Sequence, residues 1–212
     1  MFPLLLMGTA AQAPAMSPID AERAFAIDAR TMGQWTAFRR WSTDGAVMFT
    51  PQPTSVHQFI KDRADPPEAI DRWPTASYVS CDGSVAVNTG GWRGPDGSVG
   101  YFSTVWQRQK DGGWKWVVDS GGTLQAPRPR PIKPLVKRAS CPDRRRPQGG
   151  IVVTGTAAPS SNIRSGIGGS NDNTLTWLWL VRADGSRKFM AGYQNGRIFA
   201  DAIDDEIAAP AK

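Results

Sequence analysis

The segment GYFSTVWQRQKDGGWKWVVDSGG, residues 100–122, predicts two long strands joined by a tight turn. Residues 101–109 are rich in aromatic and β-branched side chains, which favour strands. The D-G-G sequence at 111–113 is typical of a hairpin turn, because glycine accepts the backbone conformations that such turns require. Residues 114–120 then form the returning strand. This hairpin holds three tryptophans, so we expect another layer of the protein to cover it.

A long amphipathic helix is predicted before the strands, over residues 18–41. Ser17 and Pro18 are typical of a helix start, because serine caps the first turn and proline fits the first helical position. Gly33 interrupts this helix at a cost of about 1 kcal/mol. Apolar residues recur three or four positions apart and so form one stripe. The stripe consists of Phe25, Ala29, Met32, Trp35 and Phe38.

The order of the predicted elements defines a fold class. A short strand at 46–50 and a short helix after it follow the long helix, and strands at 73–80 and 85–92 precede the hairpin. Helices therefore come first and four antiparallel strands follow, which is an α+β pattern with helices on one face of an antiparallel sheet. A sheet that curves around a helix leaves a pocket between the two.

Residues 17–124 resemble the NTF2-like superfamily, and within it the SnoaL-like branch and the DUF4440-type domains. The most specific part of the resemblance is the pattern W-x-x-x-x-D-G-G-W-x-x-V-x-D, which begins at Trp106 and ends at Asp119. A T-G-G-W strand end at 89–92 precedes it. The resemblance implies a cone-shaped α+β fold with an apolar cavity, in which a long N-terminal helix packs on a curved antiparallel sheet. It also implies a homodimer through the sheet.

The rest of the chain divides into three segments. Residues 1–16 resemble a signal segment, with an apolar run and an A-Q-A cleavage pattern, although no positive charge precedes the run. The alternative is a frayed apolar terminus. Residues 125–150 form a Pro/Arg-rich connector, and 151–212 form an extension with a C-terminal β-hairpin. Trp177 and Trp179 alternate in that hairpin, so we expect it to extend or pack against the first sheet.

The cleavage pattern predicts export to the periplasm or the exterior. The apolar run is too short to span a bilayer, so no transmembrane segment is expected. Export would allow Cys81 and Cys141 to form a disulfide, and the alternative is two free thiols. The two cysteines lack the C-x-x-C spacing of metal or redox sites.

The net charge of +6 does not indicate nucleic-acid binding, because it is concentrated in one segment. Between positions 126 and 149 lie eight basic residues and one acidic residue, Asp143, so the rest of the chain carries a charge of −1. The single histidine and the distant cysteines predict no metal site. The glycines at 166–169 lack the spacing of a nucleotide-binding loop, so no cofactor is expected.

Two residues are candidates for acid–base chemistry. His57 is the only histidine, and its position beside an apolar helix face suggests the rim of a cavity; the alternative is a partly exposed helix histidine. Asp119 ends the central hairpin among apolar residues, which raise the pKa of a carboxyl group. Regular alternation would place Asp119 on the face opposite Trp114 and Trp116, and only one of these faces lines the cone.

Aromatic residues on the expected helix and strands are candidates to line the pocket, and the alternative is that they form the core. These candidates are Trp35, Phe49, Tyr78, Trp92 and Trp106.

Two functions are compatible with these features. The first is an exported, non-catalytic module that binds a small apolar ligand or a protein partner. The second is a cofactor-independent lyase, isomerase or hydrolase that acts on a small apolar substrate with Asp119 or His57 as acid or base. NTF2-like proteins include isomerases, dehydratases, hydrolases, cyclases and domains without activity, so the resemblance does not choose between them.

Overall fold

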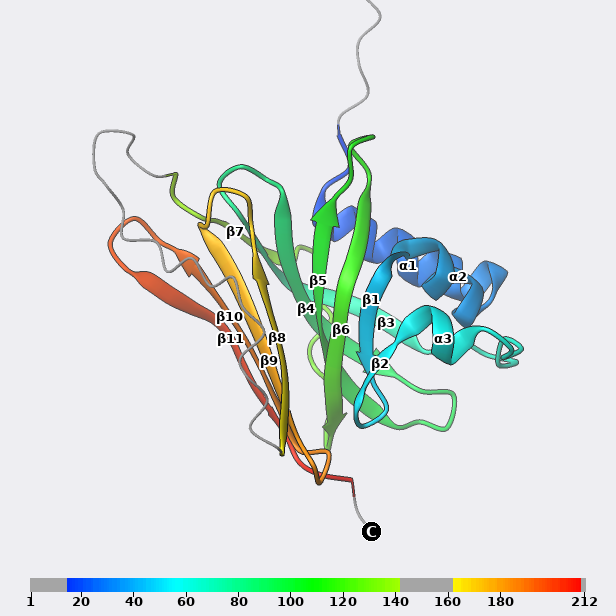
Figure 1. Ribbon diagram of the computed structural model, residues 1–212. Coiled ribbons are helices and arrows are strands. Elements are labelled where there is room, and N and C mark those ends of the chain that lie inside the picture. Colours follow the sequence, from blue (N-terminus) through cyan, green and yellow to red (C-terminus); the bar gives the residue numbers. More distant parts are fainter. Residues whose placement is uncertain (1–14, 142–161, 211–212) are drawn as a thin grey trace, which may run out of the picture.

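The computed structural model describes residues 15–141 and 162–210, in which helices and two sheets form three layers (Figure 1). The predicted signal segment lies largely outside these residues. The helices are α1 (Pro18–Met32), α2 (Gln34–Trp41) and α3 (Val56–Ile60). The strands are β1 (Ser42–Phe49), β2 (Pro53–Ser55), β3 (Asp71–Val79), β4 (Val85–Arg93), β5 (Val99–Arg108), β6 (Trp114–Leu124), β7 (Leu135–Arg138), β8 (Ile163–Gly169), β9 (Leu175–Arg182), β10 (Arg187–Gln194) and β11 (Phe199–Ile207).

The prediction of one long N-terminal helix is wrong in one respect. The helix is interrupted at Gly33, which separates α1 from α2. Gly33 has a φ of 107°, a conformation that residues with a side chain rarely adopt. The Asp65 carboxylate accepts hydrogen bonds from the backbone N–H groups of Trp35 and Thr36, at 2.5 and 3.1 Å, and so caps α2. The change in direction leaves Met32, a predicted member of the apolar stripe, 38% exposed.

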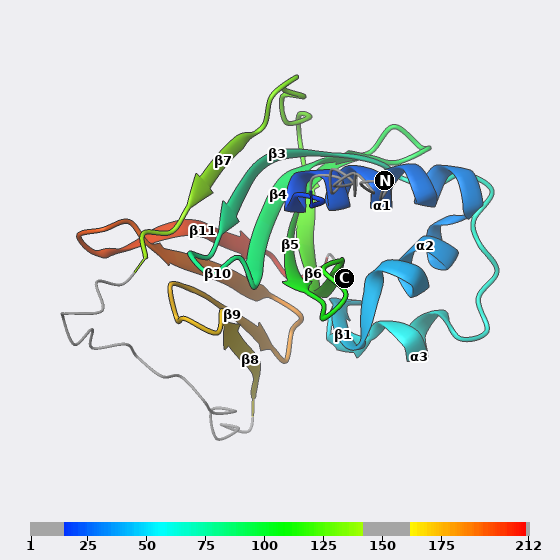
Figure 2. The same cartoon turned by 90° about the horizontal axis from the view of Figure 1, so that it is seen from above.

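The first sheet has seven strands in the order β2-β1-β6-β5-β4-β3-β7. Strands β3 to β6 form the predicted antiparallel meander. The sheet as a whole is mixed, because β1 pairs with β6 and β7 pairs with β3 in parallel. Strand β7 lies in the segment predicted to be an extended connector, so part of that segment is sheet. Seen from above, the sheet curves around the side where the helices lie (Figure 2).

The first hydrophobic core lies between the helices and the concave face of this sheet. Phe25 of α1 and Phe38 of α2 pack there with Trp106 and Trp116 of the central hairpin. The Phe25 ring lies 6.1 Å from the Trp106 ring and 6.3 Å from the Trp116 ring. The helices therefore provide the cover that the tryptophan-rich hairpin requires.

The C-terminal segment forms a four-stranded sheet, with the order β11-β10-β9-β8, in place of a single hairpin. It packs on the outer face of the first sheet through a second hydrophobic core (Figure 1). The first sheet contributes Val85, Val87, Val105 and Val118, and the second contributes Leu175, Trp179, Val181, Phe189, Ala191 and Ile203. The prediction that the C-terminal hairpin packs on the first sheet is confirmed. The outer face, through which the resemblance implies a homodimer, is covered by the chain's own second sheet.

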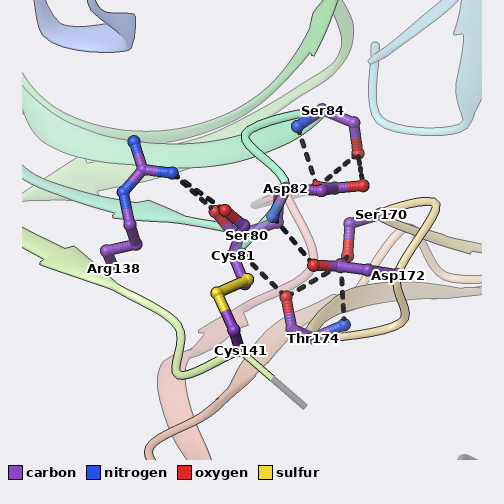
Figure 3. Close-up of a disulfide and its surroundings, with 9 residues drawn as sticks. All are labelled: Ser80, Cys81, Asp82, Ser84, Arg138, Cys141, Ser170, Asp172 and Thr174. Atoms are coloured by element: carbon purple, nitrogen blue, oxygen red, sulfur yellow. Dashed lines mark hydrogen bonds between the residues drawn. A yellow bond between two sulfur atoms is a disulfide. The ribbon is translucent and has the colours of Figure 1, made fainter. Parts of the chain in front are cut away.

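A disulfide joins the two cysteines, Cys81 after β3 and Cys141 after β7, next to a contact between two turns (Figure 3). The backbone N–H of Cys81 donates to Thr174 Oγ1 at 2.9 Å, and that of Asp82 donates to Asp172 Oδ2 at 2.8 Å. Burial would raise the pKa of Asp172, but hydrogen bonds from Ser170, Thr174 and the backbone of Asp82 hold it below its ordinary value. The disulfide therefore lies where the segment after β7 meets both sheets.

The packing between the sheets predicts a large effect of Phe189→Ala. Phe189 is fully buried between the sheets, so its truncation should lower the free energy of unfolding by about 3–5 kcal/mol. The matched control is Phe199→Ala, because Phe199 is 46% exposed and its loss should be below about 1 kcal/mol. Urea unfolding followed by tryptophan fluorescence measures both. Equal effects of the two substitutions would show that the second sheet does not pack on the first as described.

Candidate functional site

A cavity of about 230 Å³ is lined by residues of α2, of the strands β1 and β3 to β6, and of β10 in the second sheet. Its wall combines aromatic and apolar side chains with polar and charged ones, and small-molecule sites use both kinds of group. The apolar lining residues are Trp35, Phe38, Met48, Phe49, Ile70, Trp92 and Phe102. The polar and small lining residues are Gln34, Arg72, Tyr101, Asp119, Ser120, Gly121 and Arg187.

A β-bulge at Val117 places Asp119 on the concave face. The pairing of β5 with β6 shifts there, since Val105 lies opposite Val118 and Trp106 lies opposite Trp116. The extra residue reverses the alternation, so Asp119 and Trp116 both point toward the helices. The expectation from regular alternation, that these two side chains occupy opposite faces, is therefore wrong.

Asp119 is held by Arg72, whose guanidinium group is buried. Arg72 Nη1 and Nη2 donate to the two carboxylate oxygens of Asp119 at 3.2 and 3.3 Å. The hydroxyl of Thr104 also donates to Asp119, at 2.6 Å. Both oxygens of this carboxylate are thus engaged inside the protein.

The same guanidinium group forms an ion pair with Glu22 of α1, with 2.9 Å between Nη2 and Oε1. Glu22 is fully buried, and its Oε2 accepts hydrogen bonds from Trp106 Nε1 at 2.7 Å and from the Asn88 amide at 3.3 Å. Burial raises the pKa of Glu22 above its ordinary value of 4.5, although Arg72 opposes the shift. Burial would lower the pKa of Arg72, but Asp119 and Glu22 raise it.

Three of the five aromatic candidates line the cavity, namely Trp35, Phe49 and Trp92. Trp106 does not, because it is fully buried in the first core. Tyr78 lies on the opposite face of the sheet, where its ring is 5.4 Å from that of Tyr193.

The two acid–base candidates are not brought together. Asp119 lines the cavity, whereas His57 is not among the lining residues. His57 Nε2 lies 3.0 Å from the Ser42 hydroxyl, at the junction of α3 and β1.

Asp119 is a candidate from the sequence, but three other charged residues of this region, Glu22, Arg72 and Arg187, are not. The sequence could have indicated that Glu22 is buried, because it precedes Phe25 by three positions and so lies on the apolar stripe of the helix. Local sequence does not indicate the positions of Arg72 and Arg187 at the cavity, since the groups that they contact are distant in the sequence.

Outside α1 lies a wider cleft, of about 420 Å³, lined in part by Arg30, Asp71 and Arg130. Both arginines form ion pairs with Asp71, and all three side chains are substantially exposed. We regard this cleft as a solvated surface, because exposed ion pairs contribute little to binding or stability.

Within residues 15–141 and 162–210, no group of three or more histidine, cysteine or acidic side chains is arranged to hold a metal ion. Within the same ranges, no helix combines the length and apolarity needed to cross a membrane.

Comparison with known proteins gives structural similarity only. No family model matches the chain, and no curated protein matches it. A candidate ketosteroid isomerase from Parabacteroides distasonis ATCC 8503 is 15% identical with a TM-score of 0.42, over 51% of this chain and 89% of that one. The S. rosetta CaMKII hub is 19% identical with a TM-score of 0.39, over 53% of this chain and 100% of that one. The helices lie on the concave face of the curved sheet, as the resemblance to the NTF2-like superfamily implies, and this chain has a second sheet on the outer face.

The raised pKa of Glu22 predicts a pH-dependent effect of Glu22→Gln. The native state retains a proton that the unfolded state releases above pH 4.5, so this group's contribution to stability falls as pH rises toward its native pKa. The glutamine side chain does not titrate, so the stability of the variant does not fall for this reason. Its free energy of unfolding should therefore increase relative to the wild type as pH rises above 4.5.

Urea unfolding at a series of pH values above and below 4.5 measures this difference. The exposed Glu68 supplies the matched control, Glu68→Gln, which should follow the wild-type profile. A constant difference between Glu22→Gln and the wild type over this range would contradict a raised pKa at Glu22.

Proposed function

We propose that this protein is an exported NTF2-like module of the DUF4440 type that binds a small, largely apolar ligand in its cavity without catalysing a reaction. The observation that carries the proposal is the engagement of Asp119 by Arg72 and Thr104, since no other acidic side chain among the described residues lines the cavity.

The cavity wall supports an apolar ligand. Trp35 packs edge-on against Phe38 and Phe59, with ring centroids 5.4 and 5.8 Å apart, so its indole is held in place. Phe49 is held in the same way by Trp179 of the second sheet, at 5.5 Å. Aromatic rings fixed before binding offer contact area at little entropic cost.

The alternative, a lyase, isomerase or hydrolase, is favoured by the presence of Asp119 and Tyr101 in one cavity. A general base needs a free carboxylate oxygen within reach of the substrate, and Asp119 uses both of its oxygens in the ion pair. Burial and the charge of Asp205 raise the pKa of Tyr101 to about 12, so this phenol stays protonated. We therefore favour binding over catalysis.

Export is supported by the Cys81–Cys141 disulfide, because such bonds persist mainly in oxidising compartments. A small-molecule ligand is favoured over a protein partner on the sheet, because the second sheet already covers the outer face of the first.

The proposal predicts that an uncharged aromatic probe, 2-naphthamide, binds in this cavity. Titration of isotope-labelled protein, followed by two-dimensional NMR, should shift the indole signals of Trp35 and Trp92 and leave that of the fully buried Trp106 unchanged. Met48→Trp should fill the cavity and weaken binding by about tenfold or more.

The matched control is Met190→Trp, because Met190 alternates with Phe189 and Ala191 and so lies on the face of the second sheet that points away from the first. It should leave the affinity within about twofold of the wild type. Absence of binding, or binding that Met48→Trp does not weaken, would refute the cavity as the site.

A further inference from the structure

Arg187 brings a positive charge from the second sheet to the wall of the cavity. It begins β10, and its side chain reaches the end of β6, where Nη2 donates to the backbone carbonyl of Gly121. The guanidinium carbon lies 5.5 Å from the centre of the Phe49 ring. This side chain thus lies beside the apolar surface that a ligand would contact.

The charge of Arg187 is not neutralised by the described part of the chain. Within residues 15–141 and 162–210, Arg187 forms no ion pair, and its Nε is buried without a hydrogen-bond partner. Burial lowers the pKa of Arg187, yet an arginine remains protonated in proteins. A partly buried cation without a counter-charge is unfavourable, so an anion at this position would be stabilised.

The neighbouring charged groups do not supply that anion. Asp119 is engaged by the buried Arg72, and Asp205 accepts a hydrogen bond from Ser103 at 2.6 Å. Lys188, the next residue of β10, has partners of its own in the acidic residues of β11. Arg187, which is partly buried, therefore differs from the fully buried Arg72 in having no acidic partner among the described residues.

Tyr101 offers a second donor at the same place. It lines the same cavity as Arg187. Its hydroxyl group stays protonated and makes no hydrogen bond with residues 15–141 or 162–210. A planar guanidinium group and a phenolic hydroxyl together suit the two oxygens of a carboxylate.

We infer that the ligand of this cavity is a small apolar or aromatic carboxylic acid whose carboxylate binds Arg187 and whose apolar body packs on Trp35 and Phe49. This inference rests on the proposed function and specifies the chemical class of its ligand. The second sheet then both covers the outer face of the first and supplies the residue that selects an anion.

Isothermal titration calorimetry with two probes of the same ring system tests the inference. 2-Naphthoate carries a carboxylate, and 2-naphthamide replaces it with a neutral amide of similar size. The wild type should bind 2-naphthoate about tenfold or more tightly than 2-naphthamide, because hydrogen bonds to charged groups exceed those between neutral groups. Arg187→Met should abolish this preference and change the affinity for 2-naphthamide by less than about threefold.

Arg182→Met is the matched control, because Arg182 is an exposed arginine at the end of the adjacent strand β9. This variant should keep the wild-type preference for the carboxylate. Arg187→Lys retains the charge but loses the planar fork, so its preference should be intermediate.

The outcomes separate the inference from the function on which it rests. Equal affinity of the wild type for the two probes would overturn the carboxylate site and leave cavity binding intact. Failure of both probes to bind the wild type would overturn the proposed function itself. If Arg187→Met does not fold, the comparison of the two probes on the wild type still decides, because it requires no variant.

Discussion

The buried guanidinium group of Arg72 connects a helix to two strands, and the rest of the structure depends on this connection. Arg72 belongs to β3, Glu22 to α1 and Asp119 to β6, and the three side chains meet beneath the apolar core. Removing one member of such a cluster leaves uncompensated charge in a medium of low polarity. The cluster therefore holds α1 at one position on the sheet. It also engages the carboxylate of Asp119, which faces the cavity.

Two local departures from regular structure make this arrangement available. The bulge at Val117 turns Asp119 toward the helices, where Arg72 can reach it. The break at Gly33, capped by Asp65, directs α2 so that Trp35 and Phe38 line the cavity. The second sheet completes the site from the other side, because β10 carries the cation at the cavity wall. The cavity is thus built by all three layers rather than by the helices and the first sheet alone.

Much of the fold could be predicted from local sequence, and much of the site could not. The central hairpin follows from β-branched and aromatic residues around a D-G-G turn, and Gly112 there has a φ of 84°. The two-residue alternation of side chains along β6 could not reveal the bulge. A strand with one inserted residue is still a continuous run of strand-forming residues. The helix break depends on Asp65, which lies 30 positions from Trp35, so a local pattern cannot report it. The pairing of Arg72 with Asp119, 47 positions apart, is also invisible before the strands are placed.

The most direct test of this account is the stability of Arg72→Met, measured by urea unfolding beside Arg93→Met, which replaces an exposed arginine of β4. Loss of Arg72 leaves Glu22 and Asp119 without their counter-charge, so the free energy of unfolding should fall by about 3–5 kcal/mol. The Arg93 variant should stay within about 0.5 kcal/mol of the wild type. A loss in Arg72→Met no larger than that of Arg93→Met would contradict the central role of the buried guanidinium group.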